Sequence, residues 1–328
     1  MYKKIIWIKK ALVLNKDEKF KNTIFLVKSK VGIVCSGCNV IFENCKILIY
    51  RCKKANIGLF AQSAKVQLKR CFVQNATVAL KVVNSYLTIF DSKLSNNKEF
   101  AINALNSTLN IENCNIYSNG FEILSFQASF VNSRVQLVHS KIEKGINSIG
   151  LLAKNSFLSL ENTSVSFNDA AAMHLENANF YIKKAEIHDN SLLNLDCSEI
   201  YIENSKGKIE GSLLYSGKGS FVIYLTKQSC LKLLNSFVFD NRQGILIDRY
   251  SQITIYKTRI YNNAILEQQA QINADSSKLY ILFSKVFNGF QGIYAQKASY
   301  IFLKNSDISK NYFPLCIYEL SNIKMAKP

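Results

Sequence analysis

Four cysteines lie close together near the start of the chain, in the stretch VCSGCNVIFENCKILIYRC at 34–52. They are Cys35, Cys38, Cys45 and Cys52, and the first two form a Cys-x-x-Cys pair. Four thiolates at this spacing can bind one zinc ion tetrahedrally, because little chain entropy is lost when they converge. A zinc site is therefore one interpretation of this stretch.

A second group of candidate residues combines carboxylates with imidazoles, and it consists of Asp169, His174, His188 and Asp189. A carboxylate pair for glycoside cleavage must lie on one face of the protein, about 5 to 10 Å apart. These four residues fall at different offsets of the repeat described next, so we predict that they point in different directions and are not catalytic. We interpret His139 and the adjacent pair Asp248–Arg249 as surface turn residues.

One sequence unit recurs along the chain. NSTLNIENCNIYSN at 106–119 reappears in weaker form as NSFLSLENTSVSFN at 155–168, NANFYIKKAEIHDN at 177–190 and YSQITIYKTRIYNN at 250–263. The unit places one small residue two positions before a pair of alternating apolar residues and a second small residue after them, with a period of mostly 20–26 residues. Alternation with period two is typical of a strand with one buried face. Each unit is expected to form short strands.

The two small columns give another interpretation of the cysteines. Cys38 occupies the first column and Cys45 the second, where other units carry Ser or Ala, and Cys35 aligns with Ala61. Because cysteine is readily buried as a small side chain, we predict core positions and no metal site. Cys52 has no counterpart in other units, and zinc at the four thiols stays the alternative.

Units of this size cannot bury an apolar face alone, so they are expected to stack with parallel strands about 4.8 Å apart. We predict an all-β, single-stranded parallel β-helix solenoid of about 12–13 coils. A single domain is expected over 1–328, with a basic N-terminal coil at 1–31, regular coils at 32–313 and a partial coil at 314–328. A terminal asparagine column is expected to be left-handed and to form stacked amide hydrogen bonds; it comprises Asn97, Asn119, Asn168, Asn190, Asn241, Asn263 and Asn311.

This repeat resembles that of the right-handed parallel β-helix family, with its pectate-lyase-like fold and its carbohydrate-binding and sugar-hydrolase repeats, over essentially all 328 residues. The resemblance implies a right-handed coil, in line with the rule for parallel crossovers. It also implies an alternative function as a polysaccharide-active or sugar-binding protein. Hydrolases of the family carry a Gly-His-Gly motif that this sequence lacks. We therefore predict that the chain is not an enzyme and needs no cofactor.

The charge gives another functional signal. The net charge is +18 and the isoelectric point is near 9.4, and such a surface attracts polyanions. RNA or an acidic protein lattice is the expected partner, and an anionic membrane fits the charge as well. The polyanion-facing residues are predicted to be the N-terminal lysines Lys3, Lys4, Lys9, Lys10, Lys16, Lys19 and Lys21.

The nine cysteines are odd in number and scattered, which favours a reducing, intracellular compartment over a disulfide framework. No run of 18 apolar residues predicts a transmembrane segment. The chain begins inside a coil, at Ile6 and Ile8, and ends inside one, at Ile323 and Met325. Because open ends display unpaired strand edges, we expect partners to cap them. We predict a non-catalytic scaffold subunit of a large intracellular assembly, such as a ribonucleoprotein, a mitochondrial or other organellar complex, or a cytoskeletal structure.

An outward-facing column changes from charged to apolar in the later units. Charged residues such as Glu112 and Lys183 give way to apolar ones in three successive units. A contiguous apolar stripe usually marks a binding surface, and a covering loop is the alternative. The predicted partner-binding residues are Leu234, Tyr256, Tyr280, Leu282 and Phe302.

Overall fold

The computed structural model of the protein describes residues 2–50, 56–121, 125–193, 196–265, 268–319 and 321–326. Within these residues every regular element is a β-strand, and no helix is long and apolar enough to span a membrane. The chain divides into two compact units, unit 1 at 1–164 and unit 2 at 165–328. Each unit is described by itself.

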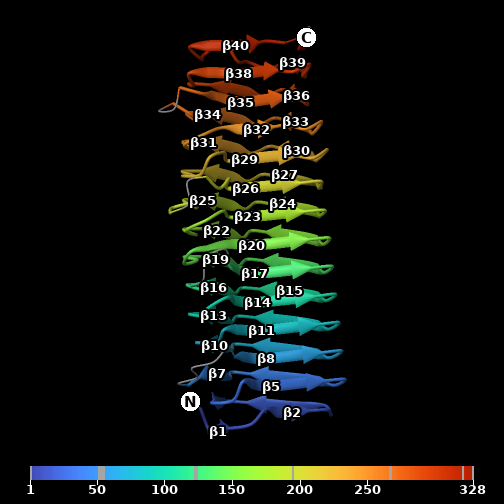
Figure 1. Cartoon of the computed structure of the whole chain (residues 1–328), viewed down its shortest axis with the longest axis vertical. Coiled ribbons are helices and arrows are strands. Elements are labelled where there is room, and N and C mark those ends of the chain that lie inside the picture. The colour runs from blue at the N-terminus through green and yellow to red at the C-terminus, as the bar shows by residue number, and fades with distance from the viewer. Residues whose placement is uncertain are drawn as a thin grey trace. The chain divides into compact units, whose positions relative to one another are not determined.

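Each unit is a parallel β-solenoid in which every coil gives one short strand to each of three sheets, A, B and C (Figure 1). The strand at Thr108–Glu112 shows why these sequences form strands. Leu109 and Ile111 are buried while Thr108, Asn110 and Glu112 face outward, and Leu109 pairs with Val135 of the next coil. Repeating the pattern in every coil builds one continuous apolar core within the unit.

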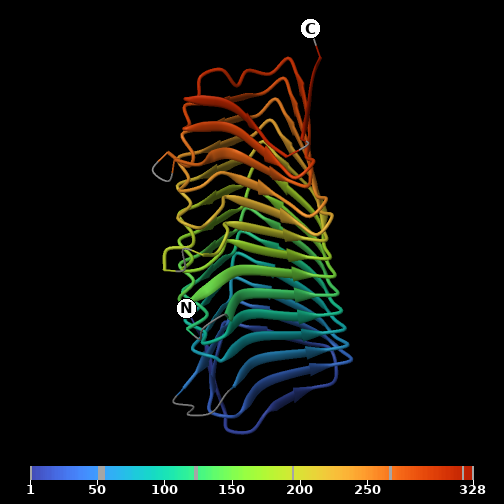
Figure 2. The ribbon, with the colours of Figure 1, turned by 45° about the horizontal axis from the view of Figure 1, so that its top comes forward.

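Unit 1 contributes seven strands to each sheet, and they stack in parallel rows (Figure 2). In sheet A the order is β1 (Lys4–Ile8), β4 (Thr23–Val27), β7 (Lys46–Ile49), β10 (Phe72–Gln74), β13 (Lys93–Ser95), β16 (Asn115–Tyr117) and β19 (Lys141–Glu143). In sheet B it is β2 (Leu12–Leu14), β5 (Val31–Ser36), β8 (Ile57–Gln62), β11 (Val78–Val83), β14 (Phe100–Leu105), β17 (Ser125–Val131) and β20 (Ser148–Lys154). In sheet C it is β3 (Glu18–Lys21), β6 (Asn39–Glu43), β9 (Lys65–Lys69), β12 (Tyr86–Phe90), β15 (Thr108–Glu112), β18 (Arg134–Val138) and β21 (Phe157–Glu161).

Unit 2 has the same three rows, and β22 (Ser164–Ser166) lies at the division between the units. In sheet A the order is β25 (Glu186–His188), β28 (Leu213–Tyr215), β31 (Phe237–Phe239), β34 (Arg259–Tyr261) and β37 (Lys285–Phe287). In sheet B it is β23 (Met173–Glu176), β26 (Ile200–Glu203), β29 (Ile223–Thr226), β32 (Ile245–Ile247), β35 (Ala270–Asp275), β38 (Gln291–Gln296) and β40 (Phe313–Ile317). In sheet C it is β24 (Asn179–Lys183), β27 (Lys206–Glu210), β30 (Cys230–Leu234), β33 (Gln252–Tyr256), β36 (Lys278–Leu282), β39 (Tyr300–Lys304) and β41 (Asn322–Ala326).

The small columns of the sequence connect neighbouring coils by hydrogen bonds. The Oγ atom of Ser85 accepts the backbone N–H of Ala64 at 3.0 Å and donates to the carbonyl of Val83 at 2.7 Å. Such a residue must be small to be buried and polar to satisfy a backbone group that the turn leaves unpaired. This double requirement explains why serine dominates the columns.

The turns use left-handed backbone throughout, and asparagine is their most frequent occupant. The predicted amide ladder is confirmed, since the Nδ2 atom of Asn97 donates to Oδ1 of Asn119 at 2.8 Å and that of Asn241 to Oδ1 of Asn263 at 2.8 Å. The predicted left-handed conformation of this column is wrong. The residue before it carries the positive φ, as at Asn96 with 57°, which leaves the ladder amides aimed into the core.

The all-β parallel β-helix is confirmed, with about 14 turns of roughly 22 residues where 12–13 are predicted. The prediction of one domain over 1–328 stays a prediction. Cys35, Cys38 and Cys45 are all buried, and the thiol of Cys38 donates to the carbonyl of Leu14 at 3.2 Å. Cys52 lies outside the described residues.

Candidate functional site

A polar groove lies on unit 2 where sheet B turns into sheet C. We name it the sheet-B groove; its volume is about 400 Å³, and it is lined by Asn177, Glu203, Asn204, Lys227, Gln228, Arg249 and Tyr250. The lining side chains come from the ends of consecutive coils. The groove is therefore built by the stacking of coils, with no contribution from an inserted loop among the described residues.

Two outward columns of sheet B supply the chemistry beside this groove. In the first column His174, Tyr201 and Tyr224 are register partners in β23, β26 and β29. In the second column Glu203 is the partner of Thr226, and Asp248 directly follows β32. Because side chains in a strand alternate between faces, the apolar residues between these positions are buried, and the polar ones lie on the outer face, where they are partly exposed except for Thr226, which is buried.

Glu203 is the centre of the first cluster. The hydroxyl of Tyr201 donates to its Oε2 atom at 2.9 Å, and the ammonium of Lys227 pairs with Oε1. The hydrogen bond from Lys227 holds the pKa of Glu203 below its usual range. Burial, followed by the hydrogen bond to Glu203, raises the pKa of Tyr201. The cluster therefore combines an ionised carboxylate with a firmly protonated phenol.

Asp248 forms a second cluster of the same composition. The hydroxyl of Tyr224 donates to its Oδ2 atom at 2.8 Å, and Nε of Arg249 lies 3.8 Å from that atom. Burial, followed by the hydrogen bond to Asp248, raises the pKa of Tyr224. The Oδ1 atom of Asp248 is buried and has no hydrogen-bond partner in the described part of the chain. A buried acceptor without a hydrogen bond lowers the stability of the fold, so its presence requires an explanation.

The same pairing of a carboxylate with a cation recurs at Asp275. Its Oδ2 atom accepts from Lys297 at 2.7 Å and from Gln296 at 3.0 Å. Burial would raise the pKa of Asp275, but these hydrogen bonds outweigh it and hold the pKa below the usual range. Three coils of unit 2 thus carry a carboxylate at the end of sheet B, at Glu203, Asp248 and Asp275. The paired cation comes from the following turn at Asp248 and from the corresponding turn of the next coil at Glu203 and Asp275.

These turns have unusual backbone. Lys227 and Gln228 have φ values of 53° and 63°, and Arg249 and Tyr250 have 49° and 63°. In six other coils the corresponding turn holds a single left-handed asparagine, at Asn84, Asn106, Asn132, Asn155, Asn177 and Asn204, whereas Lys297 and Ala298 form a third left-handed pair. Left-handed backbone costs other residues about 1–2 kcal/mol each. Burial does not offset this cost, because Tyr250 is 78% exposed. Strain of this kind is common at functional sites.

The structure separates the predicted acid–imidazole group. His188 and Asp189 form a pair on sheet A, with Nδ1 2.8 Å from Oδ2, and Asp169 follows β22. His174 lies on sheet B, where its ring packs edge-on against Tyr201 at 4.8 Å. His188 and Asp189 therefore lie on a different sheet from His174, and the structure does not bring the four residues together. That they are not catalytic stays a prediction.

Sequence reasoning missed most of the groove and assigned Asp248–Arg249 to a plain surface turn. The pair does lie in a turn, but that turn lines the groove. Tyr201, Glu203 and Lys227 were not recognised as site residues. The available signal was a cation directly after the second outward column, where six other coils have asparagine.

The remaining candidate residues are placed but not tested. Among the residues that the structure describes, no group of three or more His, Cys, Asp and Glu side chains could hold a metal ion. In the basic N-terminal region Lys19 and Lys21 pair with Glu43 at 3.5 and 3.1 Å. The partner-binding stripe is in register on sheet C, where Leu234 pairs with Tyr256 and Tyr256 with Leu282. The polyanion partners, capped ends and intracellular location stay predictions.

Comparisons with known proteins give a fold and no family. No family model and no curated protein matches the chain. A surface adhesin of Streptococcus pneumoniae is similar at 10% identity, with 94% of this chain and 82% of that chain covered and a TM-score of 0.44. A periplasmic alginate epimerase matches at 9% identity, 98% and 78% coverage and a TM-score of 0.42. A pectate lyase matches at 10% identity, 94% and 80% coverage and a TM-score of 0.36.

The three stacked parallel sheets give the chain a parallel β-helix, pectate-lyase-like fold. The predictions of a non-catalytic scaffold subunit and of a protein that is not an enzyme are wrong, because the structures that share the fold include an alginate epimerase and a pectate lyase. Terms such as ribonucleoprotein and large-complex subunit gain no support. The prediction relied on a missing local motif. A site assembled from residues of several coils leaves no such motif in the sequence.

Proposed function

We propose that the chain is a carbohydrate-active protein that binds an extended polysaccharide along the sheet-B groove. The observation that carries this proposal is the pair of carboxylate–cation–tyrosine clusters, centred on Glu203 and Asp248, beside one groove of about 400 Å³. Glu203 and Asp248 belong to coils two steps apart, which is about 10 Å along the solenoid axis. A polymer of sugar rings presents its hydroxyls at a comparable repeat.

The groups of the groove match the polar groups of a sugar. Ionised carboxylates accept hydrogen bonds from sugar hydroxyls, and the ammonium of Lys227 and the guanidinium of Arg249 donate to hydroxyl, ring or carboxylate oxygens. The ion pairs hold these side chains in place before a ligand arrives, so less side-chain entropy is lost on binding. The buried Oδ1 atom of Asp248 is an acceptor that a ligand hydroxyl can use after a small side-chain movement.

The clusters also have the parts that proton transfer needs. A polysaccharide-modifying reaction requires one group that accepts a proton and another that donates one. The lowered pKa of Glu203 keeps its carboxylate ionised and the raised pKa of Tyr224 keeps its hydroxyl protonated. The groove therefore holds one proton acceptor and one proton donor in the required states, although each shift makes the group a weaker base or acid than a free side chain.

The test compares groove variants with a chemically matched control. Wild-type protein, Glu203→Gln and Asp248→Asn are measured for binding and turnover of pectate, alginate and a neutral glucan by affinity electrophoresis and product analysis. Glu210→Gln is the control, because Glu210 accepts from Tyr181 at 2.8 Å and pairs with Lys208 at 2.8 Å on sheet C, outside the groove.

A hydrogen bond to a charged group is worth about 1.5–3 kcal/mol. Each groove variant is therefore expected to bind the preferred polymer at least tenfold more weakly, with Glu210→Gln unchanged. The proposal fails if the groove variants bind like the wild type, or if the control loses as much affinity as they do.

A further inference from the structure

Unit 2 carries two sets of outward aromatic rings, and their ring geometries differ. On sheet A five rings stack from coil to coil with centroid distances of 4.7, 5.2, 5.1 and 5.1 Å and interplanar angles of 4–15°. These rings are His188, Tyr215, Phe239, Tyr261 and Phe287. Each inner ring of this stack has both faces covered by its neighbours, and only the edges meet solvent. We name this set the sheet-A ladder and interpret it as a structural device that aligns the coils.

On sheet C the rings are tilted and do not cover one another. Tyr280 lies 5.9 Å from Tyr300 at 57° and 6.2 Å from Phe302 at 50°, and Tyr256 lies 5.7 Å from Phe283 at 75°. We name Tyr256, Tyr280, Phe283, Tyr300 and Phe302 the aromatic platform. Register pairing places Tyr280 beside Phe302 and Lys278 beside Tyr300 in adjacent strands. Ring faces that are free of aromatic neighbours can stack against the C–H face of a sugar.

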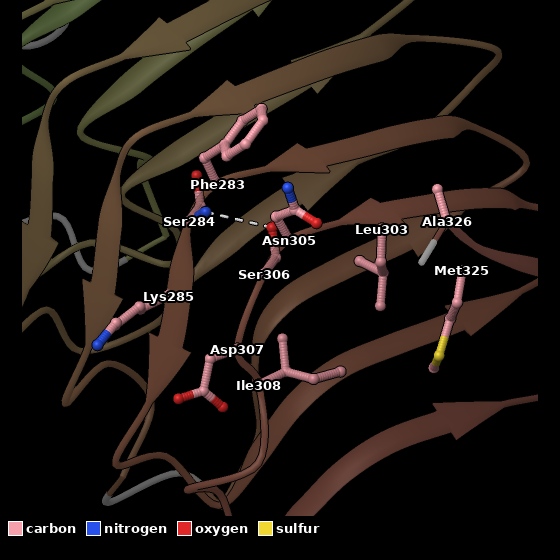
Figure 3. Close-up of a pocket in the computed structure, with 10 residues that line it drawn as sticks. All are labelled: Phe283, Ser284, Lys285, Leu303, Asn305, Ser306, Asp307, Ile308, Met325 and Ala326. Atoms are coloured by element: carbon pink, nitrogen blue, oxygen red, sulfur yellow. Dashed lines mark hydrogen bonds between the residues drawn. The ribbon is translucent and has the colours of Figure 1, made fainter. Parts of the chain in front are cut away.

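Phe283 is strained as well as exposed. Its φ is 51°, in a turn position where neighbouring coils have Asn235, Lys257 and Asn305, and 46% of its surface is exposed. A bulky residue with positive φ is a backbone outlier. Burial in the fold does not compensate this strain. Phe283 is one of the residues around a cavity of about 570 Å³ that apolar side chains such as Leu303 and Ile308 and polar ones such as Asp307 also line (Figure 3), so a recess of mixed polarity adjoins the platform.

The platform is surrounded by positive charge. Lys232, Lys278 and Lys304 face solvent on the same strands, and the ammonium of Lys257 lies 5.3 Å from the ring centroid of Tyr256. Strands β30, β33, β36 and β39 contain no Asp or Glu. Any ligand that covers these rings meets several cations and no carboxylate from these strands, which favours an anionic ligand.

We propose that the aromatic platform is a second binding surface, separate from the sheet-B groove, for an anionic polysaccharide. Its tilted rings receive the apolar faces of sugar rings, and its lysines pair with the anionic groups of the polymer. The sheet-A ladder has similar residues without free faces, and it does not bind. The inference concerns a different face from the proposed function, so each can be tested without the other.

The experiment removes ring faces while keeping apolar volume. Tyr280→Leu/Phe302→Leu is compared with wild type and with Tyr261→Leu, which removes a ring of the sheet-A ladder. Each protein is run in affinity gels that contain alginate or a neutral dextran, at low and high salt. A second set repeats the variants in the Glu203→Gln/Asp248→Asn background, where the groove no longer contributes.

The platform variant is expected to bind alginate at least tenfold more weakly, while Tyr261→Leu binds like wild type. In the groove-deficient background the platform variant is expected to abolish the remaining retention. High salt is expected to weaken this retention, because it rests on screened charges. If Tyr280→Leu/Phe302→Leu unfolds, the exposed pair Lys278→Glu/Lys304→Glu is expected to give the same loss in a folded protein.

The outcomes separate the two proposals. Wild-type retention by the platform variants overturns the inference and leaves the groove untouched. Loss of retention by the platform variants alone, with full binding by the groove variants, supports the inference and contradicts the proposed function. A change in sedimentation coefficient of the platform variants in the absence of polysaccharide shows that the surface joins two copies of the chain, and it also overturns the inference.

Discussion

Glu199 gives the sharpest quantitative prediction, because it places a carboxyl group where an amide belongs. In unit 2 Ile200 pairs in register with Ile223, Ile223 with Ile245, and Ile245 with Ile272. Glu199 precedes the first of these residues and Gln271 the last, so Glu199 and Gln271 occupy equivalent positions in their coils. The Oε1 atom of Gln271 accepts from Nδ2 of Asn263 at 3.1 Å, and its Nε2 donates to the carbonyl of Phe287 at 2.8 Å. The position requires one acceptor and one donor.

A carboxylate offers no donor, whereas a protonated carboxylic acid offers one donor and one acceptor. Glu199 is 1% exposed, and neither of its carboxyl oxygens makes a hydrogen bond of good geometry among the described residues. Burial raises the pKa of Glu199 from 4.5 to about 7 and outweighs the nearby side chain of Asn190 and the backbone N–H groups of Gly219 and Lys218, which lower it. The folded protein therefore holds Glu199 protonated at pH values where the unfolded chain ionises it.

This difference in pKa corresponds to a free energy of about 3 kcal/mol. Below pH 4.5 the group is protonated in both states and costs nothing. Between pH 4.5 and 7 the unfolded state releases the proton first, so the free energy of unfolding falls as the pH rises, and above pH 7 the loss is complete. Glu199→Gln supplies the donor and acceptor at every pH. It is expected to raise the free energy of unfolding by about 3 kcal/mol at pH 8 and to change it little at pH 4.5.

Urea unfolding followed by circular dichroism at pH 4.5, 6 and 8 tests this prediction. Glu186→Gln is the control, since Glu186 is an exposed residue at the start of β25. The reasoning is refuted if Glu199→Gln and wild type are equally stable at pH 8, or if the gain is the same at pH 4.5.

Three further predictions concern the turns and the core. Asn241→Ala removes Nδ2 donors from the carbonyls of Leu214 and Phe239 and should lower the free energy of unfolding by about 2 kcal/mol; an unchanged urea midpoint would show that the ladder is dispensable. Gln228→Gly replaces a residue with φ of 63° and should raise stability by about 1 kcal/mol, and a lower melting temperature would rule out strain at that turn. Cys38→Ser should cost about 1 kcal/mol or less, and elemental analysis should find no stoichiometric zinc; metal lost in this variant would restore the zinc interpretation.

The fold could be predicted because its physical requirements repeat in every coil. Two features recur at similar spacing along the chain: buried apolar residues that alternate, as at Leu109 and Ile111, and small residues, as at Ser85 and Ser107. A single coil structure that satisfies them therefore accounts for the whole chain. The local backbone was harder to predict. The asparagine ladder and the left-handed residue before it are neighbours, and only the geometry shows that Asn96 turns the chain while Asn97 bonds to the next coil.

The site was largely hidden because its residues are brought together by stacking. Tyr224 bonds to Asp248, 24 positions away, and Lys227 to Glu203, also 24 positions away. In the linear sequence each is an isolated polar residue at the end of a strand. The net charge of +18 led to the prediction of a binding surface at the N-terminal lysines of unit 1. In the groove of unit 2, by contrast, carboxylates pair with the cations. Charge composition therefore gave no information on this site.

Binding of a polysaccharide in the sheet-B groove can be observed directly. The most direct measurement is a crystal structure of the protein with an oligosaccharide taken from the polymer that it retains best in affinity gels. We expect sugar density in the groove, with hydroxyl or carboxylate oxygens within hydrogen-bond distance of Glu203, Lys227 and Arg249. An empty groove in crystals that hold the sugar elsewhere on the protein would contradict the claim.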